Sequence, residues 1–131
     1  FRSAAGMRPI TPTLYSAAVF VRDIDRAVEF YQSTLGLPLG KRGTFGAEFF
    51  HEGTRLGVHP AAHPNALAMV GRETGLTLFI PNLLDYCSGL DDQGVTFVSQ
   101  PTQQAWGIMA VIADPEGNRI ALWEDKLPEE A

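Results

Sequence analysis

A single cysteine and a shortage of basic residues exclude several classes of protein for this chain. Cys87 is the only cysteine among the 131 residues, so no intrachain disulfide and no Cys-x-x-Cys pair can form. Ten Lys and Arg stand against 15 Asp and Glu, which gives a net charge of −5. A nucleic-acid partner would need a basic face to neutralise phosphates, so we expect none.

Long apolar runs are also missing. No run approaches the ~20 residues that a membrane span needs, and we expect no membrane partner. The first eight residues lack the apolar centre of a signal peptide, and together with the lone cysteine this predicts a cytoplasmic protein. With 45% hydrophobic and 19% charged residues, the chain favours a packed core over disorder.

The residues that are present form one pattern used twice. An apolar run at Leu14–Val21 predicts a strand, and Asp23 is a helix N-cap residue followed by an apolar stripe that ends at Gly36. Short strands are expected near 38–42, 45–51 and 54–59. A second copy follows, with a strand at 76–80, a helix between Asn82 and Gly94, and strands near 95–99, 105–113 and 119–124.

This repetition predicts an α+β fold of two strand–helix–strand–strand–strand (βαβββ) modules. We place the first module at residues 10–60 and the second at 75–125. The linker at 61–74 is expected to be irregular, because His59-Pro60 and His63-Pro64 disfavour helix. Residues 1–9 and 126–131 are interpreted as tails, and the six residues ahead of Met7 as an addition to the natural start.

Two stretches carry a family resemblance. The first helix of the vicinal oxygen chelate superfamily resembles residues 21–31 of this chain, which are followed by Leu-Gly-Leu at 35–37. The last hairpin of the superfamily resembles residues 106–124, which contain Asp-Pro-Glu-Gly-Asn at 114–118. This group includes glyoxalase I, extradiol dioxygenases and bleomycin resistance proteins. The resemblance implies that the modules curl into a cupped mixed sheet, and we expect a homodimer. In metal-dependent members, His and Glu side chains in the cup hold a divalent cation that binds the substrate.

Strand alternation places this chain's residues at those four metal-binding positions. The two His positions correspond to Ser16 and Gly75, and the two carboxylate positions to Gly57 and Ala121. None of these residues supplies an imidazole or a carboxylate, and a divalent ion needs three or four such ligands. We therefore expect no metal ion and no cofactor.

Aromatic residues share the expected cup face. Phe20, Phe79 and Trp123 lie there by alternation, and Trp106 precedes the penultimate strand, where drug-sequestering members of the family stack an aromatic ring on the drug. Such a surface either lines an apolar small-molecule pocket or closes the cup as core. The candidate ligand-binding residues are Ser16, Phe20, Gly57, His59, Gly75, Thr77, Phe79, Trp106, Ala121 and Trp123.

Other polar residues supply weaker candidates. His59 falls on the cup face and is the one candidate general base, although a loop histidine is commonly only structural. A rearranged metal site from His59, His63 and either Glu48 or Glu52 is the alternative. Arg55 and Arg119 could hold an anionic ligand, but strand-end arginines are commonly solvated. Cys87 is expected to be a packing residue.

These patterns favour a metal-independent protein that binds an apolar or aromatic, drug-like small molecule. The alternative is a lyase, isomerase or dioxygenase-type enzyme with a displaced or absent metal site. A third hypothesis is a structural half that pairs with another protein.

Overall fold

The structure, a computed structural model, describes residues 9–126, so most of both expected tails lies outside the described residues. The elements run β1 (Ser16–Val21), α1 (Ile24–Glu29), the π-helical turn η1 (Phe30–Thr34), β2 (Leu39–Gly43), β3 (Gly46–Phe49), β4 (Arg55–Pro60), α2 (Pro64–Leu67), β5 (Glu73–Phe79), α3 (Leu83–Asp92), β6 (Thr96–Gln104), β7 (Gly107–Ala113) and β8 (Arg119–Asp125). None of the helices in this range is long and apolar enough to span a membrane.

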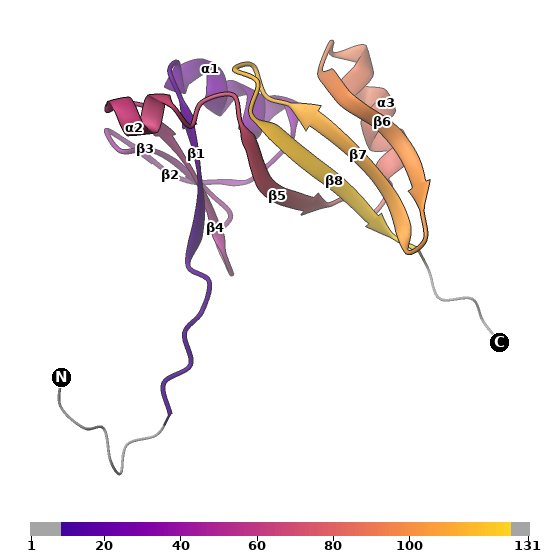
Figure 1. Cartoon of the computed structure of the whole chain (residues 1–131), viewed down its shortest axis with the longest axis horizontal. Coiled ribbons are helices and arrows are strands. Elements are labelled where there is room, and N and C mark those ends of the chain that lie inside the picture. Colours follow the sequence, from indigo (N-terminus) through magenta and orange to yellow (C-terminus); the bar gives the residue numbers. More distant parts are fainter. Residues whose placement is uncertain (1–8, 127–131) are drawn as a thin grey trace.

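The strands form two four-stranded mixed sheets with the same topology. The first has the order β1-β4-β3-β2 and the second β5-β8-β7-β6. In each sheet the first strand pairs in parallel with the last strand of its module, and the other pairs are antiparallel. The predicted pair of βαβββ modules is therefore confirmed, and the modules lie side by side in Figure 1.

Local differences from the expected elements have simple causes. The linker holds a short helix, α2, because proline is well suited to the first helical position, which Pro64 occupies. Asn82 occupies the N-cap position of α3 but makes no side-chain capping bond, and the backbone N–H of Leu83 instead donates to Glu124 of β8 at 2.9 Å. Gly75 has a φ of +73° at an irregularity in the β5–β8 pairing, and β5 extends back to Glu73.

One face of each sheet packs on the core, as strand alternation predicts. In the first sheet Val19, Val21, Leu56 and Val58 are buried, and in the second Ile120 and Leu122 are. Cys87 on α3 lies in the same core, which confirms its packing role. The residues between them along each strand therefore lie on the opposite face.

The turn between β7 and β8 ties the two modules together. The Asp114 carboxylate is 4% exposed and accepts a hydrogen bond from the Tyr31 hydroxyl at 2.8 Å. The Asn118 side-chain amide donates to the Phe20 carbonyl at 3.1 Å. Glu116 accepts from the backbone N–H groups of Arg22 and Asp23, at 2.6 and 2.9 Å. We call residues 114–118 the clasp, because each of these bonds joins the second module to β1, to the N-terminal end of α1 or to η1.

The clasp leads to a prediction about alkaline unfolding. Burial, and after it the charge and hydrogen bond of Asp114, raises the pKa of Tyr31 well above its ordinary range, and burial raises the pKa of Tyr86 to about 12. Above pH ~10 the unfolded chain loses phenolic protons that the folded chain keeps, so the free energy of unfolding falls as pH rises. Each tyrosine contributes a fall that approaches about 1.4 kcal/mol per pH unit.

Replacing Tyr31 separates its contribution from that of Tyr86. We expect Tyr31→Phe to lower the free energy of unfolding at neutral pH by about 1–2 kcal/mol. Above pH ~10 we also expect the free energy of unfolding of this variant to fall less steeply with pH, because one titrating phenol has been removed. Urea unfolding measured between neutral and alkaline pH tests both effects. Tyr15→Phe is the control, because the Tyr15 side chain is exposed and its loss should change neither quantity. A decline parallel to that of the wild type in Tyr31→Phe would contradict the prediction.

Candidate small-molecule site

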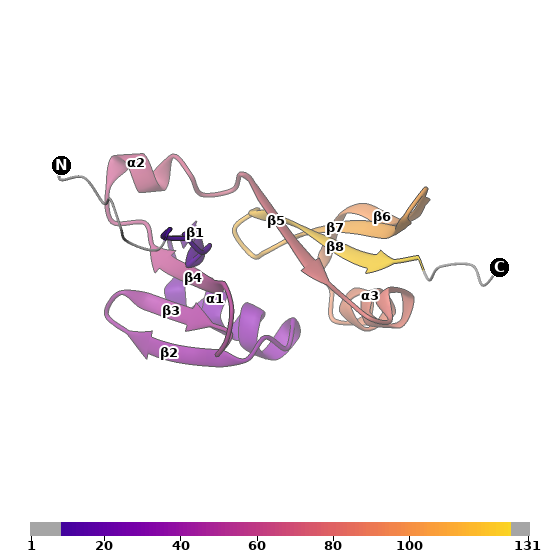
Figure 2. The ribbon, with the colours of Figure 1, turned by 90° about the horizontal axis from the view of Figure 1, so that it is seen from below.

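The sheet faces opposite the core do not face one another within one chain. In Figures 1 and 2, α1 lies on the side of the first sheet toward the second module, and α3 lies behind the second sheet in the view of Figure 1. The two uncovered faces therefore point in different directions. We call them the first open face, on strands β1, β3 and β4, and the second open face, on strands β5, β7 and β8.

The ten expected ligand-binding residues divide between these faces. Ser16, Phe20, Gly57 and His59 lie on strands of the first sheet, while Gly75, Thr77, Phe79, Ala121 and Trp123 lie on strands of the second. Trp106 lies in the turn between β6 and β7 and is 80% exposed. A single chain thus does not bring the predicted residues into one pocket.

His59 is the central polar side chain of the first open face. Its Nδ1 lies 2.8 Å from the carbonyl oxygen of Phe45. Its ring centroid lies 6.0 Å from that of Phe20 and 6.4 Å from that of Phe45, so two aromatic rings lie near the imidazole.

The imidazole occupies space that a side chain at position 57 would need. A Cβ added to Gly57 would lie 2.5 Å from Nε2 of His59, far inside van der Waals contact. Sequence analysis assigned Gly57 to one of the family's carboxylate positions, and in the structure the ring of His59 lies over this residue. Only glycine allows this placement of the ring.

Charged groups border the same face. Glu48 on β3 pairs across the sheet with Gly57, and its carboxylate lies 3.9 Å from Nε of Arg55. Both side chains are largely buried, so Arg55 is a partner of Glu48 and not the solvated residue that sequence reasoning favoured. Ala18 and Gly57 pair directly on the neighbouring strands β1 and β4. The first open face therefore combines these charged side chains and His59 with the rings of Phe20 and Phe45.

The second open face is mainly apolar, with one carboxylate, that of Asp125, which accepts a hydrogen bond from the Trp123 indole N–H at 2.6 Å. Cross-strand pairs place Phe79 beside Trp123, and Trp123 beside Met109 on the next strand. Ala121 pairs in the same way with Thr77 and Val111. A Cβ on Gly107 would lie 2.6 Å from the Trp123 ring, so this glycine makes room for the indole. Phe79 is 61% exposed, although apolar rings of its size are usually buried.

The residues at the four expected metal positions do not fit a metal ion. Ser16, Gly57 and Ala121 offer no imidazole or carboxylate, and the φ of +73° at Gly75 would strain a histidine there. Between residues 9 and 126 no group of three or more His, Cys, Asp and Glu side chains is arranged to hold a metal. The alternative site from His59, His63 and Glu48 or Glu52 is accordingly not assembled.

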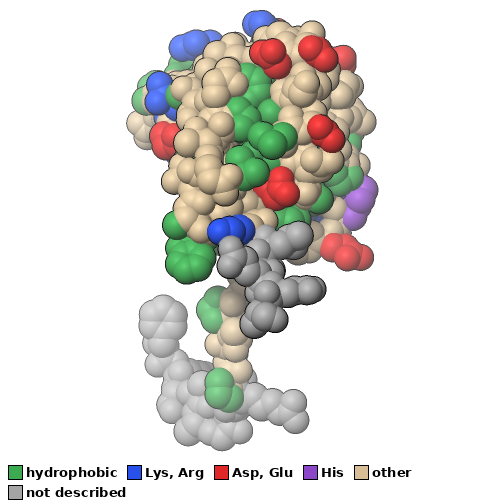
Figure 3. Space-filling view, turned by 90° about the vertical axis from the view of Figure 1, so that its right-hand side faces the viewer, with side chains coloured by type: hydrophobic (Ala, Val, Ile, Leu, Met, Phe, Trp, Pro, Cys, Tyr) green, Lys and Arg blue, Asp and Glu red, His purple; other side chains and the backbone are tan. Residues whose placement is uncertain are grey.

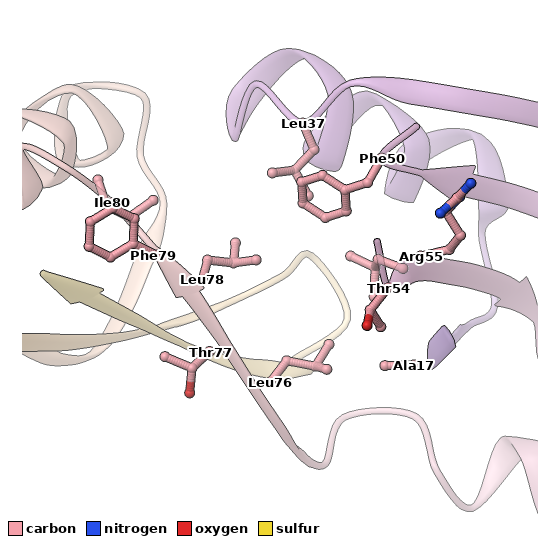
Figure 4. Close-up of a pocket in the computed structure, with 11 residues that line it drawn as sticks. Ala17, Leu37, Phe50, Thr54, Arg55, Leu76, Thr77, Leu78, Phe79 and Ile80 are labelled. Carbon is pink, nitrogen blue, oxygen red and sulfur yellow. The ribbon is translucent and has the colours of Figure 1, made fainter. Parts of the chain in front are cut away.

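A separate cleft opens between the modules, on the core side of the sheets. It has a volume of about 390 Å³ and an apolar lining. Figure 4 shows Leu37 and Phe50 on one side, and Leu78 and Phe79 of β5 with the adjoining Ile80 on the other. Thr77 and Phe79 are the only residues that this cleft shares with the expected ligand-binding set. Sequence alternation did not reveal it, because it depends on how the modules are placed.

Two features of the first open face were also missed by sequence reasoning. The Phe45 carbonyl comes from the turn before β3, and backbone groups leave no mark in a sequence. The pairing of Glu48 with Gly57 depends on strand register, which the sequence did not fix. A usable signal was present in Gly57 and His59, because residues two apart on a strand lie on the same face.

Comparisons with known proteins agree with this fold. Residues 13–122 match the model of the family described as Glyoxalase/Bleomycin resistance protein/Dioxygenase superfamily. The chain is 32% identical over 118 residues to the uncharacterized protein YurT of Bacillus subtilis (strain 168), covering 80% of this chain and 93% of that protein.

Solved structures give the same result. TnmS3, an antibiotic binding protein from Streptomyces sp. CB03234, is 26% identical, with a TM-score of 0.74 over 92% of this chain and all of that one. A superfamily member from Sphaerobacter thermophilus DSM 20745, 22% identical, superposes with a TM-score of 0.74 over 88% of this chain and 98% of its own. With both modules, the clasp and these matches in place, the chain belongs to the glyoxalase/bleomycin resistance protein/dioxygenase superfamily.

Proposed function

We propose that this protein binds an aromatic or apolar, drug-like small molecule without using a metal ion. The proposal rests on the residues found at the four expected metal positions. They hold Ser, Gly, Gly and Ala, and the imidazole of His59 covers one of them. The space that metal ligands would fill is left to a ligand, next to the aromatic side chains of Phe79 and Trp123.

Two copies of the chain would complete the pocket. Each open face is only half of a cup, and the faces of one chain point in different directions. A homodimer that sets the first open face of one copy against the second open face of the other would enclose a ligand and cover the exposed Phe79 ring.

Similarity and charge give secondary support. TnmS3 is described as an antibiotic binding protein, and at 26% identity it suggests the same class of ligand for this chain. The net charge of −5 is compatible with a cationic ligand. Figure 3 shows acidic side chains around exposed hydrophobic ones at the end of the second module.

A second candidate function is metal-free acid–base catalysis of the lyase or isomerase type. It depends on His59, whose Nδ1 is held by the Phe45 carbonyl and whose Nε2 lies over Gly57, a placement suited to a general base. The proposed binding function does not require this step.

Metal analysis distinguishes a metal-free site from a metal centre. We expect protein purified without added metal to contain no stoichiometric Mn, Fe, Ni or Zn, because the described residues offer no suitable set of ligands. Elemental analysis measures this directly, with His59→Ala as a second sample. A near-equimolar metal that disappears in His59→Ala would overturn the proposal in favour of a metalloenzyme.

Removal of Phe79 tests the second open face. We expect Phe79→Ala to weaken binding of a planar aromatic drug, found by a thermal-shift screen, by about tenfold or more, since a buried aromatic ring contributes at least ~1.5 kcal/mol. Leu84→Ala on α3 is a matched control, because Leu84 is 57% exposed and lies away from both open faces. Equal dissociation constants for the two variants would show that the ligand does not bind at this face.

The oligomeric state tests the two-copy pocket. We expect sedimentation equilibrium to give twice the chain mass of 14.3 kDa, and Phe79→Asp to shift the protein toward the monomer by placing a charge in the interface. Leu84→Asp should leave the dimer intact. A monomeric wild-type protein that still binds aromatic drugs would place the ligand elsewhere, with the cleft between the modules as the next site to test.

A further inference from the structure

We infer, on the basis of the proposed function, that the ligand is an aromatic compound that carries a hydrogen-bond donor, such as a phenolic hydroxyl, at the end that meets the first open face. Three observations support this class of ligand: the tautomer of His59, the position of its Nε2, and the different polarity of the two open faces.

The Phe45 carbonyl fixes the tautomer of His59. A carbonyl oxygen can only accept a hydrogen bond, so the Nδ1 that lies 2.8 Å from it carries the hydrogen. In a neutral imidazole the other nitrogen then has the lone pair, and Nε2 is a hydrogen-bond acceptor.

This acceptor is held on the first open face. Leu56 and Val58 are buried in the core, so the intervening Gly57 faces the opposite side, and Nε2 lies where its Cβ would point. None of the hydrogen bonds found between residues 9 and 126 uses Nε2. The bond to the Phe45 carbonyl holds the imidazole, with the rings of Phe20 and Phe45 nearby, so a ligand would meet an acceptor that is already in position.

The neighbouring groups favour a donor on the ligand. A second acceptor on this face is the Glu48 carboxylate, whose charge is balanced by Arg55. The aromatic body of the ligand would lie against Phe79 and Trp123 on the mainly apolar second open face. A ligand without a donor would cover Nε2 and leave it unpaired and without water, which lowers affinity.

A matched pair of compounds isolates the donor. 2-Naphthol and 2-methoxynaphthalene share the aromatic body, but only the naphthol can donate a hydrogen bond. We expect the wild-type protein to bind 2-naphthol about fivefold more tightly in fluorescence titrations at neutral pH, because a net hydrogen bond is worth about 1 kcal/mol. The ratio of the two dissociation constants is the readout.

Two independent variants should remove this preference. His59→Phe keeps a ring but has no acceptor, and Gly57→Ala keeps the histidine but displaces its ring, since the new Cβ would lie 2.5 Å from Nε2. In both we expect the ratio to fall to about one, with 2-methoxynaphthalene bound nearly as well as before. Ser88→Ala removes an exposed hydroxyl on α3, away from both open faces, and should keep the wild-type ratio. Thermal unfolding of each variant verifies that it is folded.

The outcomes distinguish the class of ligand from the proposed function itself. Equal affinity of the wild type for the two compounds, or tighter binding of the ether, overturns the donor assignment and leaves small-molecule binding standing. A wild-type preference that persists in folded Gly57→Ala and His59→Phe also overturns the assignment to His59. Failure of both compounds to bind contradicts the proposed function, and the donor assignment with it.

Discussion

The buried carboxylate of Asp114 is the group on which the arrangement of this molecule depends. Its two oxygens accept hydrogen bonds from the Tyr31 hydroxyl, the side-chain and backbone N–H groups of Asn118, and the backbone N–H of Glu116, all between 2.8 and 3.0 Å. A carboxylate so far from water is stable only when its acceptor positions are filled in this way. The same bonds shape the β7–β8 turn and attach it to the first module. They therefore help to set how the sheets are placed, and with that the directions of the two open faces.

A glycine opposite a ring recurs on both open faces. Gly57 leaves room for the imidazole of His59, and Gly107 leaves room for the indole of Trp123. In each case a Cβ would collide with the ring, and at Gly107 it would also lie 2.1 Å from the carbonyl oxygen of Glu124. A restricted ring presents a fixed surface at little cost in conformational entropy when a ligand binds. The two faces thus share this device but differ in chemistry, because His59 offers an acceptor nitrogen whereas the indole N–H of Trp123 is already bonded to Asp125.

Sequence reasoning predicted the fold well because the fold follows from local patterns. The Asp23 cap, the turn at 114–118 and the alternation of apolar residues are all short-range features, and the structure confirms each of them. What could not be predicted depends on long-range geometry. The bond from Tyr31 to Asp114 joins residues 83 positions apart, and the bulge at Gly75 needs its partner strand. The candidate residues were assigned to the correct strands, but their division between two diverging faces depends on module placement, which no local pattern encodes.

The turn that carries the family resemblance and the residues of the proposed site are physically separate, although they are close in sequence. Asp114 and Asn118 are buried between the modules, whereas Ala121 and Trp123 alternate with the buried Ile120 and Leu122 and lie on the open face. A change at position 121 therefore leaves the core and the clasp untouched. The open faces can consequently vary without loss of the fold, so one scaffold can support different chemistry. In this chain the ring of His59 lies over Gly57 and places a ring nitrogen on the first open face, at a position where the family resemblance led us to expect a metal ligand.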